Sequence, residues 1–190
     1  MSEFLAVADQ FQLGMLDTER PHPLTTDLSR LDREDLPSAI DLLREVDRKA
    51  LEVLSGKIDQ IIPLAEAIAD TLECGNRIFL CGCGATGRLS ISLEIFAREG
   101  LLNGATAENV IGFMAGGDAA LIRSIERFED RPDYGERQLL DLGFAEGDLL
   151  ISSTEGGETP FVIGATEAAA RISTRAPFFL YCNPDDILIE

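Results

Sequence analysis

The sequence predicts an α/β fold, a three-layer doubly wound parallel sheet with helices on both faces. Strand-like and helix-like segments alternate from residue 77 onward. Two of the strand-like segments, DLLIS and FFLYC, are nearly continuously apolar, which is typical of parallel strands covered on both sides. Helices that connect such strands cross over in the right-handed sense. Glycine-rich turns open into several of these helices.

Helical periodicity also precedes the alternating part. Apolar residues recur three or four apart from Leu36 to Leu54, and a second helix follows in which Asp59 caps a first turn that contains Pro63. The predicted strands are 77–81, 110–115, 148–152 and 177–182, and the predicted helices between them are 86–98, 119–128, 136–142 and 159–171.

Before these helices the pattern changes. A short apolar-periodic stretch runs from Phe4 to Leu16, and a polar segment with two prolines follows, which predicts an extended arm. We therefore divide the chain into residues 1–35, an N-terminal helix and arm, and residues 36–190, one α/β domain.

The glycine-rich turn from Phe79 to Arg88 is the most informative segment. Helix N-termini carry unpaired backbone N–H groups and about half a positive charge, so they bind anions without a lysine. Gly82, Gly84 and Gly87 allow close approach of the backbone. Thr86 adds a side-chain donor. The turn predicts a phosphate site, and a plain strand-to-helix connector is the alternative.

Two nucleotide-binding motifs fit this turn poorly. The dinucleotide fingerprint G-x-G-x-x-G is met at 82–87, but no acidic residue ends a second strand about twenty positions later. The P-loop also fails, because no Gly-Lys-Ser/Thr follows.

Charge and cysteine usage limit the partners. Sixteen basic and 34 acidic residues give a formal net charge of −18, which repels nucleic acid and membrane surfaces, so neither is expected as a partner. The four cysteines lack the spacing of a disulfide framework, and the N-terminus lacks a signal peptide, which favours reduced thiols and a cytoplasmic protein. With one histidine, His22, beside Cys81-x-Cys83, no metal site is expected.

Three predicted loops, 82–87, 115–118 and 152–159, follow strands at the carboxyl edge of the sheet, where doubly wound folds bind ligands. A helix cap explains any single loop, and Asp118 and Thr159 have the character of N-caps. Their convergence favours a cradle for a phosphorylated small molecule. The predicted contacts are Gly84, Ala85, Thr86, Gly87, Arg88, Ser152, Ser153, Thr154 and Thr159.

Three sequence blocks resemble the sugar isomerase (SIS) domain family, within it the N-acetylmuramic acid 6-phosphate etherases and the glucokinase regulatory proteins. GCGATGRL at 82–89 resembles the family's G-x-G-T-S-G-R-L. AGGDAALIRSIERFED at 115–130 resembles its A-G-G-E/D block ending in Glu-Asp, and GGETPFVIGA at 156–165 resembles S-G-R-T-P-Y-V-I-G-A. The blocks follow the family's order and cover most of the chain.

The resemblance implies an SIS-type domain that binds a hexose phosphate, commonly as a homodimer whose partner subunit lines the pocket. In the etherases, elimination followed by water addition breaks the ether bond between lactate and the amino-sugar phosphate, with two glutamates as acid and base. The resemblance implies no metal and no cofactor. Family members continue well beyond residue 190, which predicts an SIS domain truncated at its C-terminus.

Several positions depart from the family pattern. Ala85 replaces a threonine and removes a donor, while Thr86 replaces a serine and keeps the hydroxyl. Gly156 stands at a serine position and Glu158 at an arginine position, so a donor and a positive charge are lost there.

Of the two positions where the resemblance implies glutamates, one holds a glutamate in this sequence and the other does not. Glu129 matches one of them, with a solvated surface carboxylate as its alternative role. The other holds Phe96, which cannot transfer a proton. Glu94 points about 200° away on the helix, and Glu99 is a replacement only if the helix ends before it. Each proton transfer contributes about 10²–10⁴-fold, so the missing carboxylate argues against full etherase activity.

Two functions remain open at this stage. The first is a carbon-oxygen lyase of the etherase type that acts on an amino-sugar phosphate, with Glu129 as its candidate catalytic residue. The second is a non-catalytic sugar-phosphate sensor that resembles the glucokinase regulatory proteins. Phe96 and Glu158 favour the second function, whereas Glu129 and the overall likeness favour the first.

Overall fold

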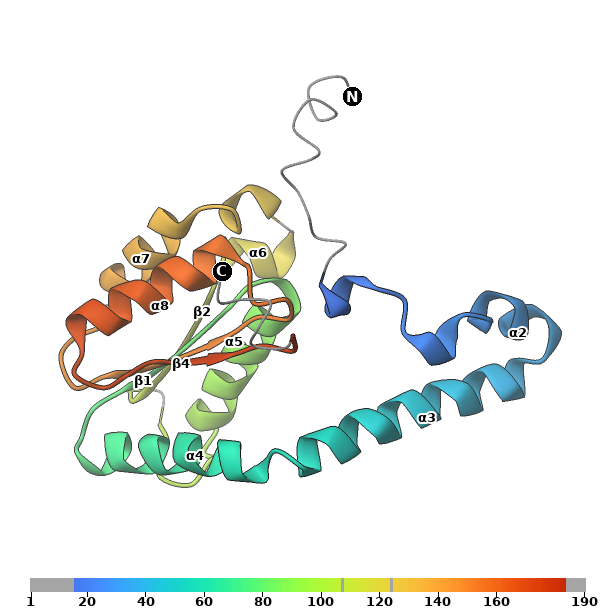
Figure 1. Ribbon diagram of the computed structural model, residues 1–190. Helices are drawn as coiled ribbons and strands as arrows, with labels where there is room; N and C mark the ends of the chain where they lie inside the picture. Colours follow the sequence, from blue (N-terminus) through green and yellow to red (C-terminus); the bar gives the residue numbers. More distant parts are fainter. Residues whose placement is uncertain (1–15, 107, 124, 184–190) are drawn as a thin grey trace, which may run out of the picture. The chain divides into compact units, whose positions relative to one another are not determined.

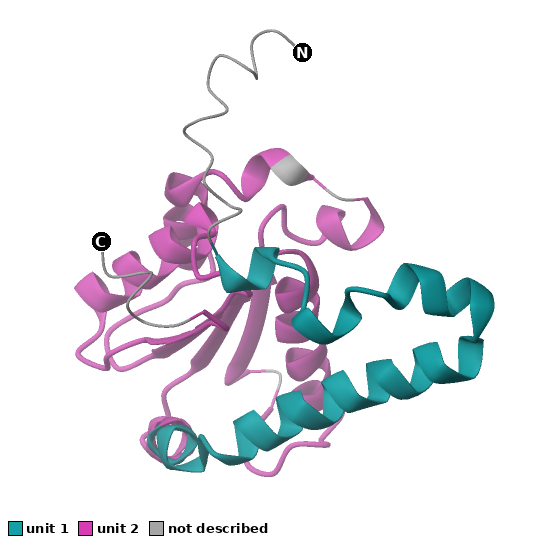
Figure 2. Ribbon diagram, turned by 45° about the vertical axis from the view of Figure 1, so that its right-hand side comes forward, with its two compact units in different colours: residues 1–63 teal, residues 64–190 magenta. Residues whose placement is uncertain are grey.

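The computed structural model describes residues 16–106, 108–123 and 125–183. Contacts divide the chain into two compact units, Met1–Pro63 and Leu64–Glu190, which Figure 2 shows in different colours. The predicted division after residue 35 stays a prediction. The apolar stretch predicted from Phe4 lies outside the described residues, apart from Leu16.

The first unit consists of helical segments. Two 3-10 turns, η3 (Asp17–Glu19) and η4 (Pro23–Thr25), and the short helix α2 (Leu28–Glu34) precede α3 (Leu36–Ser55). The segment predicted as an extended arm is therefore partly helical. Local bonds explain the difference, because His22 Nδ1 accepts the Leu24 N–H at 3.2 Å and Pro23 stands in the first turn of η4, where no N–H is needed.

The helix α4 (Ile58–Glu73) begins one residue before the predicted cap, Asp59. Pro63 therefore lies inside the helix and not in its first turn, so the Asp59 carbonyl lacks the N–H that an ordinary residue 63 would supply. The helix ends at Glu73, and Gly75, two residues later, has a φ of 76°, which suits glycine. Over the described part of the chain, no helix is long and apolar enough to cross a membrane.

The second unit is the predicted parallel α/β sheet (Figure 1). Its strands are β1 (Ile78–Gly82), β2 (Val110–Met114), β3 (Leu149–Ser153) and β4 (Phe178–Leu180). All pairings are parallel and the strand order is β2-β1-β3-β4. The order reverses between β1 and β3, which marks the switch point where such sheets bind ligands.

Helices cover both faces of the sheet (Figure 1). On one face, Ile78, Leu80, Leu149 and Ile151 pack against α4 and α5 (Gly84–Arg98). On the other face, alternate residues of the same strands pack against α7 (Pro132–Asp141) and α8 (Pro160–Ile172), as the two-residue period of strands requires. This second core includes Phe79, Cys81, Phe113, Leu139, Leu150, Phe161, Val162 and Ala165.

Two glycines let α7 and α8 lie in close contact. A Cβ on Gly135 would lie 1.9 Å from the Phe161 carbonyl oxygen, and one on Gly164 would lie 2.1 Å from that of Pro132. No other residue fits there without a shift of the backbone. The two helices are thereby held at fixed positions next to the third loop.

The helix predicted over 119–128 is broken, which is a correction. The structure has α6 (Ala119–Ile122) and η5 (Glu126–Phe128), with Arg123 extended between them. Ile125 then packs beside Gly116, whose Cβ would lie 3.5 Å from that of Ile125. This tertiary contact overrides the helical spacing and turns the chain before Glu129.

Candidate functional site

The loop between β1 and α5 is closed by hydrogen bonds of its own. The Cys83 N–H donates to Thr86 Oγ1 at 3.1 Å, and that hydroxyl donates to the Cys83 carbonyl at 2.9 Å. Gly84 adopts a φ of 53°, which favours glycine. The Thr86 hydroxyl therefore fixes the start of α5, since its single proton is used inside the loop.

The other predicted loop residues divide into two groups. Gly84, Ala85 and Arg88 are exposed at the helix start, where backbone N–H groups lack intrahelical partners. Gly87 is buried, its N–H donates to the Cys83 carbonyl at 3.2 Å, and a Cβ there would lie 2.5 Å from that of Met114. Gly87 therefore serves packing against β2.

The hydroxyl groups of the third loop are mostly engaged within the protein. Ser152 is fully buried, and its Oγ lies 2.7 Å from Oγ1 of Thr166 on α8. Thr154 Oγ1 lies 2.9 Å from Thr159 Oγ1. Ser153 is partly exposed and makes only a long, 3.4 Å hydrogen bond to a backbone carbonyl. Ser153 is thus the best placed of the predicted hydroxyl contacts, and Ser152 belongs to the core.

Both predicted N-caps stand at helix starts without acting as caps. Asp118 has helical backbone angles, and its side chain makes no capping hydrogen bond. The side chain of Thr159 does not cap α8 either, because its hydroxyl pairs with Thr154 across the third loop.

Glu129 lies where the segments around the site meet. Its Oε2 accepts a hydrogen bond from Cys83 Sγ at 3.2 Å, 46 residues away in the sequence. Its backbone carbonyl accepts the N–H of Phe161, in the first turn of α8, at 2.9 Å. The half-buried residue is thereby joined to the β1–α5 loop by its side chain and to α8 by its main chain.

The Cys83 thiol is the donor in this contact. Burial first, and then the hydrogen bond and charge of Glu129, raise the pKa of Cys83 to about 12. The thiol is therefore protonated at neutral pH and presents its S–H to the carboxylate. A protonated thiol is a poor nucleophile, so covalent catalysis by Cys83 is not supported.

Phe96, the position that the resemblance assigns to a second glutamate, lies far from this loop. Phe96 is 43% exposed on α5 and about 18 Å along the helix axis from its first residue. Glu94 cannot replace the acid, since its Oε2 accepts the Gly112 N–H of β2 at 2.7 Å. Glu99 does follow the end of the helix, as its candidacy required, but it lies at the opposite end from the loop.

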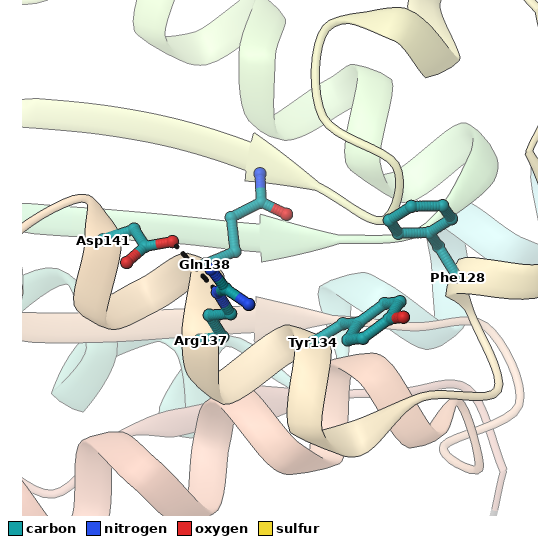
Figure 3. Close-up of a pocket in the computed structure, with 5 residues that line it drawn as sticks. All are labelled: Phe128, Tyr134, Arg137, Gln138 and Asp141. Atoms are coloured by element: carbon teal, nitrogen blue, oxygen red, sulfur yellow. Dashed lines mark ion pairs between the residues drawn. The ribbon is translucent and has the colours of Figure 1, made fainter.

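An open pocket of about 330 Å³ lies between η5 and α7 (Figure 3). Its lining residues are Phe128, Tyr134, Arg137, Gln138 and Asp141. The rings of Phe128 and Tyr134 are tilted by 50° to each other, with centroids 5.1 Å apart. None of the predicted contacts lines this pocket. Among the residues that the structure describes, no group of three or more histidines, cysteines or acids could hold a metal ion.

Sequence comparison finds relatives among sugar-phosphate enzymes. An N-acetylmuramic acid 6-phosphate etherase from Trichormus variabilis is 34% identical over 179 residues, which cover 94% of this chain and 56% of the relative. One from Salmonella agona is 33% identical over 175 residues, 91% of this chain and 56% of the relative. The chain thus spans about half the length of these curated relatives.

Solved structures share the fold at lower identity. A phosphoheptose isomerase from Neisseria gonorrhoeae has a TM-score of 0.54 at 18% identity, covering 77% of this chain and 73% of its own. One from Francisella tularensis has a TM-score of 0.55 at 20% identity, with the same coverage. Residues 60–170, more than half of this chain, also match the glucokinase regulatory protein N-terminal SIS domain. The chain therefore belongs to the SIS domain family, as its three sequence blocks predicted.

Proposed function

We propose that this protein binds a phosphorylated amino sugar at the carboxyl edge of its sheet and is of the N-acetylmuramic acid 6-phosphate etherase type. The start of α5 at the β1/β3 switch point would hold the phosphate through the exposed backbone of Gly84 and Ala85 and the Arg88 side chain. Ser153, which pairs with Gly82 in register, would add a hydroxyl from β3.

The observation that carries this proposal is the contact between Glu129 and the β1–α5 loop, in which the Glu129 carboxylate oxygen lies 3.2 Å from the Cys83 sulfur. In the proposed reaction, a base takes a proton from a ring carbon, the C–O bond to lactate breaks as the leaving oxygen takes up a proton, and water then adds across the double bond that has formed. Glu129 is the carboxylate that would take this proton. The 34% identity to an etherase supports the choice of substrate.

A second candidate is a non-catalytic sensor of sugar phosphates. Phe96 supports it, because protonation of the leaving oxygen has no carboxylate at that position. The match to the glucokinase regulatory protein domain supports it as well. On this proposal the loop and Glu129 bind the ligand without breaking the ether.

One experiment separates the two. The protein is incubated with N-acetylmuramic acid 6-phosphate, lactate release is followed enzymatically, and binding is followed by calorimetry. Lactate release that Glu129→Gln abolishes and Asp130→Asn retains supports the lyase. Binding without release supports the sensor. Absence of binding of this sugar phosphate and of glucosamine 6-phosphate would overturn the proposed site.

We also propose that the chain forms a homodimer through α5. Leu89 and Phe96 lie two turns apart on one side of this helix, 55% and 43% exposed, and Ile95 beside them is 45% exposed. Exposed apolar side chains that gather on one helix are typical of interaction surfaces. Sedimentation velocity tests the proposal, with a dimer expected for the wild type and a monomer for Leu89→Lys. A monomeric wild type would contradict it.

A further inference from the structure

Phosphate binding at the β1–α5 loop does not account for the position of the Cys83 side chain. Its backbone is fixed on both sides, because its N–H and its carbonyl are both bonded to the Thr86 hydroxyl. With the backbone held in this way, the thiol is aimed from the end of β1 at the Glu129 carboxylate. The same sulfur also contacts backbone N–H groups at the start of α5, where it takes part in a capping box with Thr86.

We propose that Cys83 is a positioning residue whose thiol donates a hydrogen bond to Glu129 and holds this carboxylate at the phosphate loop. The catalytic meaning of this contact rests on the proposed function of Glu129. The contact itself can be tested without any activity.

The chemistry of the two groups fixes the direction of the bond. The thiol Sγ donates the hydrogen bond and the carboxylate Oε2 accepts it. Burial and the Glu129 charge raise the pKa of Cys83 to about 12, with a smaller contribution from Asp130, so the donor persists through the physiological pH range.

The contact holds the Glu129 side chain in a segment that has no regular secondary structure. Glu129 lies in the turn between η5 and α7, outside any helix or strand. The N–H of Phe161 fixes its backbone carbonyl but leaves the side-chain torsions free. The thiol restricts these torsions, and it occupies one carboxylate oxygen so that the other can take up a proton. A base must lie within hydrogen-bond reach of the proton it removes, so this restriction contributes to turnover.

The first test measures the contact directly. Alkylation of Cys83 by iodoacetamide is followed by peptide mass spectrometry against pH, with the exposed Cys74 as internal reference. We expect Cys83 to react much more slowly than Cys74 at pH 9. In Glu129→Gln its rate should rise about tenfold for each unit by which its pKa falls. Asp130→Asn is the matched control and should change the rate less. Equal rates in the wild type and Glu129→Gln would overturn the contact.

The second test measures its consequence in the intact protein. Cys83→Ala should lower kcat for lactate release about tenfold with KM unchanged, and Cys83→Ser, which keeps a donor, should restore most of it. Cys74→Ala is the control. An unchanged kcat in Cys83→Ala, or a Ser variant no better than Ala, would overturn the positioning role. If the wild type releases no lactate, the proposed lyase fails, while the alkylation result still decides whether the contact exists.

Discussion

At the residue scale, Glu129 and Phe96 stand at the two positions that the family resemblance assigns to glutamates, and the two residues have different surroundings in the structure. Glu129 is half-buried and bonded at the β1–α5 loop, whereas Phe96 is exposed and about 18 Å along α5. A side chain at position 96 therefore cannot serve the loop of its own chain. If it acts at all, it acts on a site formed with a second copy.

Restoring a carboxylate at this position tests that idea. Phe96→Glu should raise the rate of lactate release by up to about 10²–10⁴-fold, the contribution of one proton-transfer group. Because the side chain lies on the proposed dimer surface of α5, sedimentation velocity is used to check that each variant still forms the dimer. Phe96→Gln, which has the same shape without an acid, is the control. Equal rates in the Glu and Gln variants would mean that position 96 takes no part in the chemistry.

Thr86 is a second residue-scale case, because its role lies in the loop's own hydrogen bonds. Thr86→Val removes both bonds to Cys83 and should lower the free energy of unfolding by about 1–2 kcal/mol. Sugar-phosphate binding should weaken about tenfold as the loop loses its shape. Thr86→Ser keeps the hydroxyl and should resemble the wild type. Denaturant unfolding and calorimetry measure the two effects, and unchanged affinity in the valine variant would contradict this role.

Some features of single residues could be predicted from the sequence and others could not. The tight turn of the β1–α5 loop was predictable from its glycines. The side of β3 on which Ser152 lies was not, since hydroxyls at 152, 153 and 154 fit either face of a strand. The bond between Cys83 and Glu129 could not be predicted, because the two residues are 46 positions apart and Glu129 is placed by the helix break at Arg123.

At the scale of elements, the alternating pattern predicted all four strands and most helices. Continuous apolar runs specify buried parallel strands, and glycines and prolines mark their ends. The broken helix around Arg123 was missed because its apolar spacing is helical, and the contact of Ile125 with Gly116 decides the outcome. The start of α7 at Pro132 was missed for a different reason, since the polar segment EDRPDYGE at 129–136 is typical of a bend.

The crossing of α7 and α8 gives a prediction at this scale. Gly164→Ala places a Cβ 2.1 Å from the Pro132 carbonyl oxygen, so the helices must separate. The free energy of unfolding should fall by about 1–3 kcal/mol or more, as in overpacked cores. Gly56→Ala is the control, because its φ is negative and its nearest neighbour would lie 3.4 Å away. Chemical denaturation compares them, and equal stability of the two variants would contradict the close crossing.

At the scale of the whole molecule, a net charge of −18 surrounds a site proposed for an anion. Local donors at the start of α5 must attract the phosphate against a repulsive field. The exposed Arg88 side chain is the basic group within that loop. The two influences differ in range, because salt screens distant surface charges far more than contacts within the loop.

This difference in range predicts how binding responds to salt. Raising sodium chloride from about 20 to about 150 mM shortens the Debye length to about 8 Å, which screens the repulsion while the loop contacts persist. The Kd for N-acetylmuramic acid 6-phosphate, measured by calorimetry, should therefore fall modestly. In Arg88→Ala the affinity should be lower at every salt concentration and should improve more steeply, because the repulsion is then less compensated. N-acetylglucosamine, which lacks a phosphate, should show no such trend. A steep loss of affinity with salt in the wild type would mean that attraction by basic side chains dominates at the site, and that the negative field of the molecule does not reach it.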